Sequence, residues 1–444
     1  MSEAPDRDIK SAVVSRLTWR LVPFLFLLYI VAYLDRINVG FAALQMQEQL
    51  GFSDAVYGTG AGIFFAGYFL FQVPSNLVLS RVGARRWLSV IMIVWGVISS
   101  SMIFVSTPKS FYAMRFLLGL AEAGFFPGVI LYLKNWFPAD ARARTVALFM
   151  TAAPLSGVVG GPISGALLGL HHLGDLAGWQ WMFLLEGVPA ILFGGVVFIY
   201  LTDSPQDAHW LIAEHRVWLV DTLQHESEPS VGENNLGENI AVINKPNPFT
   251  AFTSGRIWML AFVYFALNTC SYGISLWLPN LIRSLSGVSE FNIGLLSAIP
   301  YIAAAVAMVL AGLHSDRTGE RRWHVAVSAF VGAAALLIAS QTTSLVPMIA
   351  AISVAVLGVF AMLGPFWAMP TSLLNATTAA AGIALINSIG NLGGFTGPYI
   401  IGLLRTSTGE FRGGLLVLST ALAVSGCVVL LVRIQRSPPV ALHS

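Results

Sequence analysis

The sequence predicts an all-α polytopic membrane protein with twelve transmembrane helices in two pseudo-symmetric six-helix bundles. Charged residues make up only 10% of the 444 residues and apolar residues 56%, whereas roughly a quarter of the residues in a soluble domain are charged. The mean hydropathy is +0.74. A water-soluble chain of this length cannot bury so much apolar surface. The composition therefore excludes an ordinary cytosolic enzyme, a disordered chain and a disulfide-built secreted domain.

Twelve apolar stretches are long enough to cross a bilayer, which requires about 20 residues per helix. Their centres lie near Tyr29, Phe69, Trp95, Glu122, Val158, Leu192, Tyr272, Ala303, Val331, Leu357, Ile389 and Val429. The apolar runs are continuous rather than alternating, which excludes a β-barrel. The polar leader from Met1 to Arg20 enters the first stretch without a small-residue cleavage site, so we expect no cleavable signal peptide.

The positive charges predict the orientation of the chain. Of the 24 lysines and arginines, 18 fall in segments on the same side as the N-terminus and 4 on the opposite side. Cytoplasmic segments carry such an excess, so both termini are expected in the cytoplasm. The two remaining positive residues, Arg36 and Arg115, lie at membrane depth.

The predicted domain organisation is a bundle over residues 1–202, a cytoplasmic linker over 203–253 and a second bundle over 254–444. The linker is the one long polar segment between apolar stretches, and it is too short to form a separate catalytic domain. We expect one amphipathic helix in it, near Ala208 to Leu223.

Several kinds of partner are excluded by the residue inventory. The net charge of +2 is too small to indicate nucleic acid binding. Cys270 and Cys427 both lie in apolar stretches and the eight histidines are scattered, so neither a disulfide framework nor a metal site is expected. No nucleophile elbow or phosphate-binding loop appears. We therefore expect neither an enzyme nor a resident cofactor.

The two bundles repeat each other with an offset of 236 residues. The segment 76–86, which contains Arg81 and Arg85, aligns with the segment 312–322. The same shift places Gly157, Gly161 and Pro162 on Gly393, Gly397 and Pro398. Two separate segments sharing one offset imply duplicated halves, related by an axis normal to the membrane. Glycines four residues apart, at 157, 161 and 165, also permit close helix approach.

The loop of the second half reads G-x-x-x-D-R-x-G-x-R-R and resembles the signature loop of the major facilitator superfamily. A tight turn at Gly319 would leave Arg317 and Arg321 free to pair with Asp316 and with helix C-termini. Such a lock would close the cytoplasmic side in one state. The first-half copy has Ser80 in place of the acid. The alternative interpretation is that these arginines only enforce topology.

Four ionisable residues lie inside predicted helices, where charge is costly and usually functional. Asp35 and Arg36 are adjacent in the first helix, and Arg115 and Glu122 lie two turns apart on one face of the fourth. One interpretation assigns protonation to Asp35 and Glu122 and anion binding to Arg36 or Arg115. The other treats the four as structural pairs between the two helices. Glu186 is expected to be interfacial and structural.

The combination Y-L-D-R-x-N in the first helix and R-x6-E in the fourth resembles the anion:cation symporter family of this superfamily, whose members carry organic anions with protons or other cations. The resemblance implies that Asp35 and Glu122 couple protons and that Arg36 and Arg115 contact substrate. It also implies that the transport cavity is lined by Tyr33, Tyr68, Trp367 and Asn387.

The stretches Val73–Leu77, Gly119–Gly128 and Pro154–Pro162 look most like those of tartrate-type transporters. The resemblance implies a monomeric carrier in the lipid of a bacterial inner membrane. It would import a small hydroxycarboxylate such as tartrate by proton symport and alternating access. An importer of sugar acids or aromatic acids, or a proton-coupled exporter of the same fold, remains the alternative.

Overall fold

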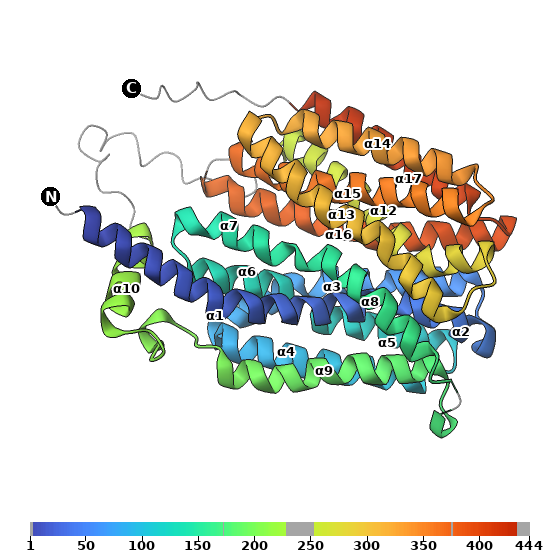
Figure 1. The fold of residues 1–444 in the computed structure, drawn as a ribbon, viewed down its shortest axis with the longest axis horizontal. Coiled ribbons are helices and arrows are strands. Elements are labelled where there is room, and N and C mark those ends of the chain that lie inside the picture. Colours follow the sequence, from blue (N-terminus) through green and yellow to red (C-terminus); the bar gives the residue numbers. More distant parts are fainter. Residues whose placement is uncertain (1–2, 172, 228–252, 374–375, 433–444) are drawn as a thin grey trace.

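The computed structural model describes residues 3–171, 173–227, 253–373 and 376–432, and shows long helices gathered in two groups side by side (Figure 1). Within the described residues, eleven helical segments are long and apolar enough to cross a membrane. The twelfth predicted centre, Ile389, lies in a further long helix, α16. The predicted all-helical, multi-pass fold is therefore confirmed.

The first group of helices runs up to residue 200, and a short helix follows it. Their bounds are α1 Glu3–Ile37, α2 Val39–Leu50, α3 Asp54–Val82, α4 Ala84–Ser100, α5 Pro108–Glu122, α6 Phe125–Trp136, α7 Ala139–Met150, α8 Ala152–Leu168, α9 Gly178–Tyr200 and α10 Ala213–Ser227. Three single 3-10 turns, η1 Ser101–Phe104, η2 Leu173–Asp175 and η3 Pro205–Asp207, lie between them.

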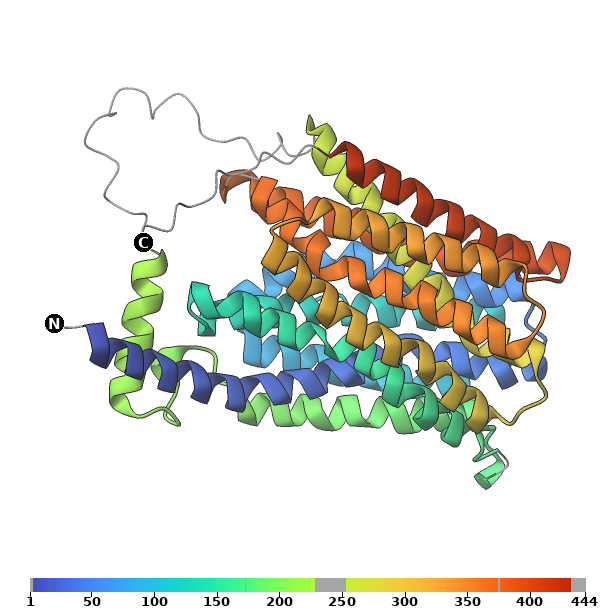
Figure 2. The ribbon, with the colours of Figure 1, turned by 45° about the horizontal axis from the view of Figure 1, so that its top comes forward.

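The second group begins at Gly255. Its helices are α12 Gly255–Leu285, α13 Glu290–Thr318, α14 Arg322–Ser340, α15 Leu345–Leu373, α16 Ala376–Thr408 and α17 Arg412–Leu431. Helix α17 ends at the same end of the molecule at which α1 begins (Figure 2). We call the opposite end, which carries α2 and the first turns of α3 and α13, the distal end.

Three of the predicted spans are each built from two helices. The span Asp8–Leu50 joins α1 to α2, Pro108–Trp136 joins α5 to α6, and Ala139–Leu168 joins α7 to α8. The first break follows Arg36 by one residue and the second directly follows Glu122. The helix boundaries therefore lie beside two of the four charges predicted at membrane depth, and the residues there, Asn38 and Ala123, keep right-handed helical torsion angles.

The two groups meet through helix pairs that repeat each other. A Cβ added at Gly58 of α3 would lie 2.6 Å from the carbonyl oxygen of Pro398 in α16. One added at Gly294 of α13 would lie 2.2 Å from the carbonyl oxygen of Gly161 in α8. The shift of 236 relates Gly58 to Gly294 and Pro398 to the neighbour of Gly161. The predicted close helix approach at Gly161 is confirmed. The contact between Gly58 and Pro398 is its counterpart on the other side of the axis.

Helix α10 lies where one linker helix is predicted, but it begins five residues later than Ala208. The turn η3 comes first, held by a hydrogen bond of 2.8 Å from the Ser204 hydroxyl to Asp207 Oδ2. The boundaries 1–202, 203–253 and 254–444 stay a prediction, and residues 228–252 lie outside the described residues.

Candidate functional site

Arg36 of α1 forms an ion pair with Glu122 of α5 in the middle of the first group, and both side chains are buried. Arg36 Nη1 also donates a hydrogen bond of 3.0 Å to the hydroxyl of Tyr272, which belongs to α12 in the second group. We call Arg36, Glu122 and Tyr272 the central cluster. A single guanidinium thus links an acid of one half to a hydroxyl of the other.

Aromatic rings surround this guanidinium. Its central carbon lies 5.2 Å from the ring centroid of Tyr68 and 6.0 Å from that of Tyr33. Phe64 lies 5.5 Å away. Rings at such distances attract a cation through their quadrupole. Two of the four residues predicted to line the cavity, Tyr33 and Tyr68, therefore lie around Arg36.

Asp35 points to a different neighbour. It is fully buried, and its carboxylate accepts hydrogen bonds from Trp95 Nε1 at 2.9 Å and from the Ser99 hydroxyl at 2.8 Å, both on α4. Adjacent helical residues diverge by about 100°, so Asp35 and Arg36 contact different elements. Among the described residues, no hydrogen bond joins Asp35 to Glu122 directly.

Arg115 is also fully buried, two turns from Glu122 on α5. Its Nε donates to the carbonyl oxygen of Gly60 at 3.4 Å, and its guanidinium lies 5.0 Å from the Phe64 ring centroid. Within the described structure, its two Nη atoms have no hydrogen-bond partner. A carboxylate is the acceptor that matches such a fork of donors.

Trp367 and Asn387, the other two predicted lining residues, lie in the second half. Trp367 of α15 packs edge-on against Tyr264 at 4.9 Å between ring centroids and against its neighbour Phe366. Asn387 is half-buried in α16. Three residues further along this helix, the ring of Tyr264 lies directly over Gly390. These contacts form an aromatic group of the second half rather than part of the central cluster.

Tyr272 is the member of the central cluster that the sequence reading misses. A tyrosine in an apolar helix gives no charge signal. The repeat does mark it, however, because adding 236 to Arg36 gives Tyr272. Two residues that are related by the repeat and lie on its axis contact each other. The offset of 236 is therefore the sequence signal that could have identified Tyr272.

The signature loop of the second half folds around Gly319, whose φ of +66° ends α13 in the left-handed region that favours glycine. Arg321 pairs with Asp316 at 2.5 Å and also donates to the Ser315 hydroxyl. Arg317 is exposed. The ion pair that the loop forms here lies within the second half.

In the first half the corresponding loop uses a different acid. The backbone amide of Arg85 donates to Asp203 Oδ1 at 2.9 Å, and its side chain approaches the same carboxylate at 3.5 Å. The Ser80 hydroxyl instead donates to the carbonyl oxygen of Leu77, and Arg81 is exposed. Asp203, just beyond α9, thus provides the acid that position 80 lacks.

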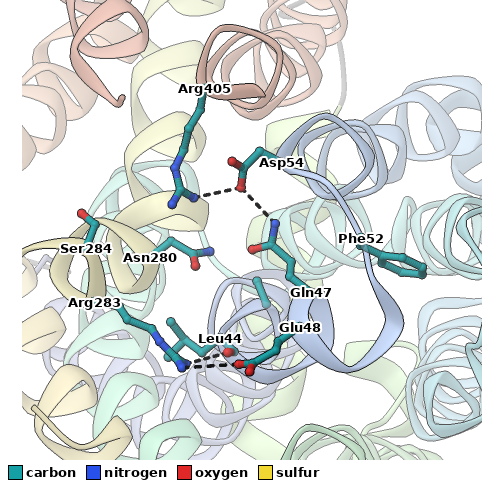
Figure 3. A pocket seen from close by; sticks show the side chains of 10 residues that line it. Leu44, Gln47, Glu48, Phe52, Asp54, Asn280, Arg283, Ser284 and Arg405 are labelled. Carbon is teal, nitrogen blue, oxygen red and sulfur yellow. Dashed lines mark hydrogen bonds and ion pairs between the residues drawn. The ribbon is translucent and has the colours of Figure 1, made fainter. Parts of the chain in front are cut away.

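The distal end is closed by contacts between the two halves (Figure 3). Arg405 of α16 pairs with Asp54 of α3 at 2.9 Å, and Arg283 of α12 donates to the Leu44 carbonyl oxygen at 2.6 Å. Arg283 also lies 3.9 Å from Glu48. Among the described residues, every ion pair that joins the two halves lies here, around a cavity of about 380 Å³.

The repeat also organises this closure. The offset of 236 relates Asp54 to Glu290, and both acids stand in the first turn of a helix. Gln47 donates to Asp54 at 3.0 Å, and its counterpart Arg283 lies 4.0 Å from Glu290. The pairing of these two positions is therefore repeated in the two halves, whereas the ion pair of Arg405 is not, because the offset places Gly169 at its counterpart position.

A comparison with known proteins decides the family. The family model described as "Major Facilitator Superfamily" matches residues 25–398. The chain belongs to the major facilitator superfamily. It is therefore a membrane transporter by family, and within its described part no three His, Cys, Asp or Glu side chains gather where they could hold a metal ion.

Relatives and solved structures agree with this membership. An Agrobacterium vitis protein named "Putative tartrate transporter" is 48% identical, over 98% of this chain and 94% of its own. A "Quinolone resistance transporter" of Acinetobacter baumannii is 40% identical, over 90% of this chain and 89% of its own. The structure of a bacterial homolog to the human lysosomal transporter Spinster, inward-facing and occupied, has a TM-score of 0.73 and 17% identity. It covers 93% of this chain and 96% of that one. This last likeness shows the major facilitator fold.

Proposed function

We propose that the protein imports a small hydroxylated carboxylate of the tartrate class together with protons. The observation that carries the proposal is the central cluster, in which one buried arginine is shared between Glu122 of one half and Tyr272 of the other. The Agrobacterium vitis relative named for tartrate supports the substrate class. The membrane is the bacterial inner membrane, and the carrier works as a monomer.

Coupling follows from competition for Arg36. When Glu122 is ionised, it occupies the guanidinium. Protonation removes that negative charge, so Arg36 becomes available for a substrate carboxylate. Substrate and proton therefore favour each other's binding, and this reciprocal effect is the thermodynamic requirement for symport. Arg115, with its two unpartnered Nη atoms, is the second candidate for a carboxylate of a dianion.

Movement follows from the paired halves. Because the positive residues predict a cytoplasmic N-terminus, the distal end faces the outside. Its closure then corresponds to a state in which the cluster communicates with the cytoplasm. Rocking of the halves would break the contacts of Arg405 and Arg283 and open the site outward.

Purified protein in lipid vesicles tests the function. An inward proton gradient should drive accumulation of labelled tartrate, and a protonophore should abolish it. A panel of sugar acids and aromatic acids, used as competitors, identifies the preferred carboxylate. If the gradient drives no carboxylate inward, the proposal fails.

Export is the second candidate, and the 40% identical relative named for quinolone resistance favours it. The same vesicles separate the two, with compound loaded inside. Expulsion driven by an inward proton gradient would support an exporter and contradict import.

A cross-link should lock the distal closure. The backbone amide of Ala55 donates to the Thr406 hydroxyl at 2.8 Å, so the two Cβ atoms lie near each other across the halves. In a background lacking Cys270 and Cys427, the pair Ala55→Cys and Thr406→Cys should form a disulfide on mild oxidation and stop transport. A reductant should restore it. Each single cysteine variant is the control, and full transport by the cross-linked protein would contradict the rocking mechanism.

A further inference from the structure

Glu186 of α9 is a buried acid that the mechanism above does not use. Its side chain is 6% exposed and packs inside the protein. The interfacial position that the sequence suggests stays a prediction. The hydroxyl of Ser164 in α8 donates to Oε1 at 2.7 Å. The other carboxyl oxygen, Oε2, has no hydrogen-bond partner in the described structure. A buried carboxylate oxygen without a donor is costly, so this group needs an explanation.

Asn38, at the break between α1 and α2, lies between Glu186 and Asp35. Its Nδ2 is 3.5 Å from Asp35 Oδ1, and the same side chain faces the Glu186 carboxyl. Asn38 is fully buried, and its Oδ1 has no partner among the described residues. The amide oxygen can accept a hydrogen bond from a protonated carboxyl group, and the amide nitrogen can donate one to an ionised carboxylate.

The groups around Asp35 and Glu186 come from several helices. Ser164 and Asn38 are the groups that face Glu186. Asp35 is faced by Ser99 and Trp95, and it interacts electrostatically with Glu186, Glu122 and Arg115. Asp35 and Glu186 therefore repel each other when both are ionised, whereas Arg115 attracts Asp35. Two such carboxyl groups in a dry interior do not both ionise.

Glu186 lies nearer to the distal end of the molecule than Glu122 does. Helices α9 and α5 both start at the distal end. At 1.5 Å per residue, Glu186 lies about 12 Å from the start of α9, whereas Glu122 lies about 21 Å from the start of α5. A proton that enters from the distal end therefore reaches the level of Glu186 before that of the central cluster.

We propose that Glu186 and Asp35, which Asn38 bridges by hydrogen bonds, hold one proton between them, and that Glu186 is the outer acid from which protons reach the coupling acids. This inference rests on the proposed proton symport. The proton leaves a Glu186 carboxyl oxygen and binds an Asp35 carboxylate oxygen, while Asn38 orients the two groups and stays neutral, so neither a covalent bond between residues nor a redox partner is needed. Glu186 is a positioning and relay residue, since it does not contact substrate.

The variant Glu186→Gln separates proton relay from packing, because glutamine keeps the volume and can still accept from Ser164. Uptake driven by a proton gradient should fall at least about tenfold, while exchange of labelled for unlabelled substrate at equal pH stays at the wild-type rate. The pH profile of uptake should change as well. Wild-type driven uptake with an unchanged pH profile would overturn the proposal.

Two further arms keep the test decisive. Asn38→Leu leaves both acids but removes the link, and should reproduce the loss if Glu186→Gln fails to fold. Infrared spectra of the protonated-carboxyl band, recorded against pH without substrate in a Glu122→Gln background, should show two titration steps more than about one pH unit apart. Either Asp35→Asn or Glu186→Gln should leave one step. This readout stands even if no tested carboxylate is transported, so failure of the inference is distinguishable from failure of the proposed function. Independent, unshifted titrations would overturn the shared proton.

Discussion

Replacing Arg36 with alanine is expected to abolish carboxylate transport. Truncating one partner of a buried, hydrogen-bonded charge pair at a binding site costs roughly 2–5 kcal/mol, and at about 1.4 kcal/mol per decade this corresponds to a loss of substrate affinity of at least about 25-fold. Two losses combine here, because the substrate carboxylate loses its cation and Glu122 is left unpaired. Initial uptake rates and a thermal-shift titration with substrate measure the effect.

Graded and matched controls accompany this variant. Tyr272→Phe removes one hydrogen bond to the guanidinium, which is worth about 1.5–3 kcal/mol, so the loss should be smaller than for Arg36→Ala. Arg256→Ala changes an exposed arginine in the first turn of α12 and should leave transport unchanged. Wild-type affinity in Arg36→Ala would remove Arg36 from the binding site.

Replacing Glu122 with glutamine is expected to uncouple the carrier. Glutamine has nearly the same volume but cannot ionise, so it resembles the protonated acid permanently. Arg36 then stays available, and exchange of substrate across the membrane should persist. Accumulation against a gradient should fall at least about 100-fold, and substrate affinity should no longer rise as the pH falls. Proton uptake with a pH dye, measured together with substrate uptake, checks both parts.

The matched control is Glu226→Gln. Glu226 pairs with Arg142 at 3.3 Å in the first half, and both are partly exposed. The same chemical change at this position should leave coupling intact. If Glu122→Gln accumulates substrate like the wild type, Glu122 is not a coupling residue and the competition mechanism is wrong.

The helices and the central ion pair were predictable because their causes are local or periodic. Long apolar runs predict membrane spans, and a charged residue inside such a run is visible in the sequence. Arg36 and Glu122 carried that signal, whereas Tyr272 did not because its hydroxyl stands among apolar neighbours. The direction of Asp35 toward Trp95 depends on how α4 packs, and the sequence of α1 does not contain that information.

The contacts that close the distal end could not be predicted from the sequence either. Asp54 and Arg405 are far apart in the chain, and each is an ordinary surface charge at a helix end. Nothing in either local sequence tells that they meet. Asp203 replaces the acid missing at Ser80 for the same reason, since only the three-dimensional path of the chain after α9 brings it to Arg85.

The meeting of Arg36 with its repeat partner Tyr272 bears on how such a carrier arose. In an ancestral homodimer of one half, the residue at this place would face an identical copy of itself. Two guanidinium groups would repel each other there. Two tyrosine hydroxyls would provide no positive charge to bind an anion. In a single chain the two copies are free to differ. One polypeptide can therefore keep a single positive charge where its lobes touch, a composition that symmetric subunits could never reach.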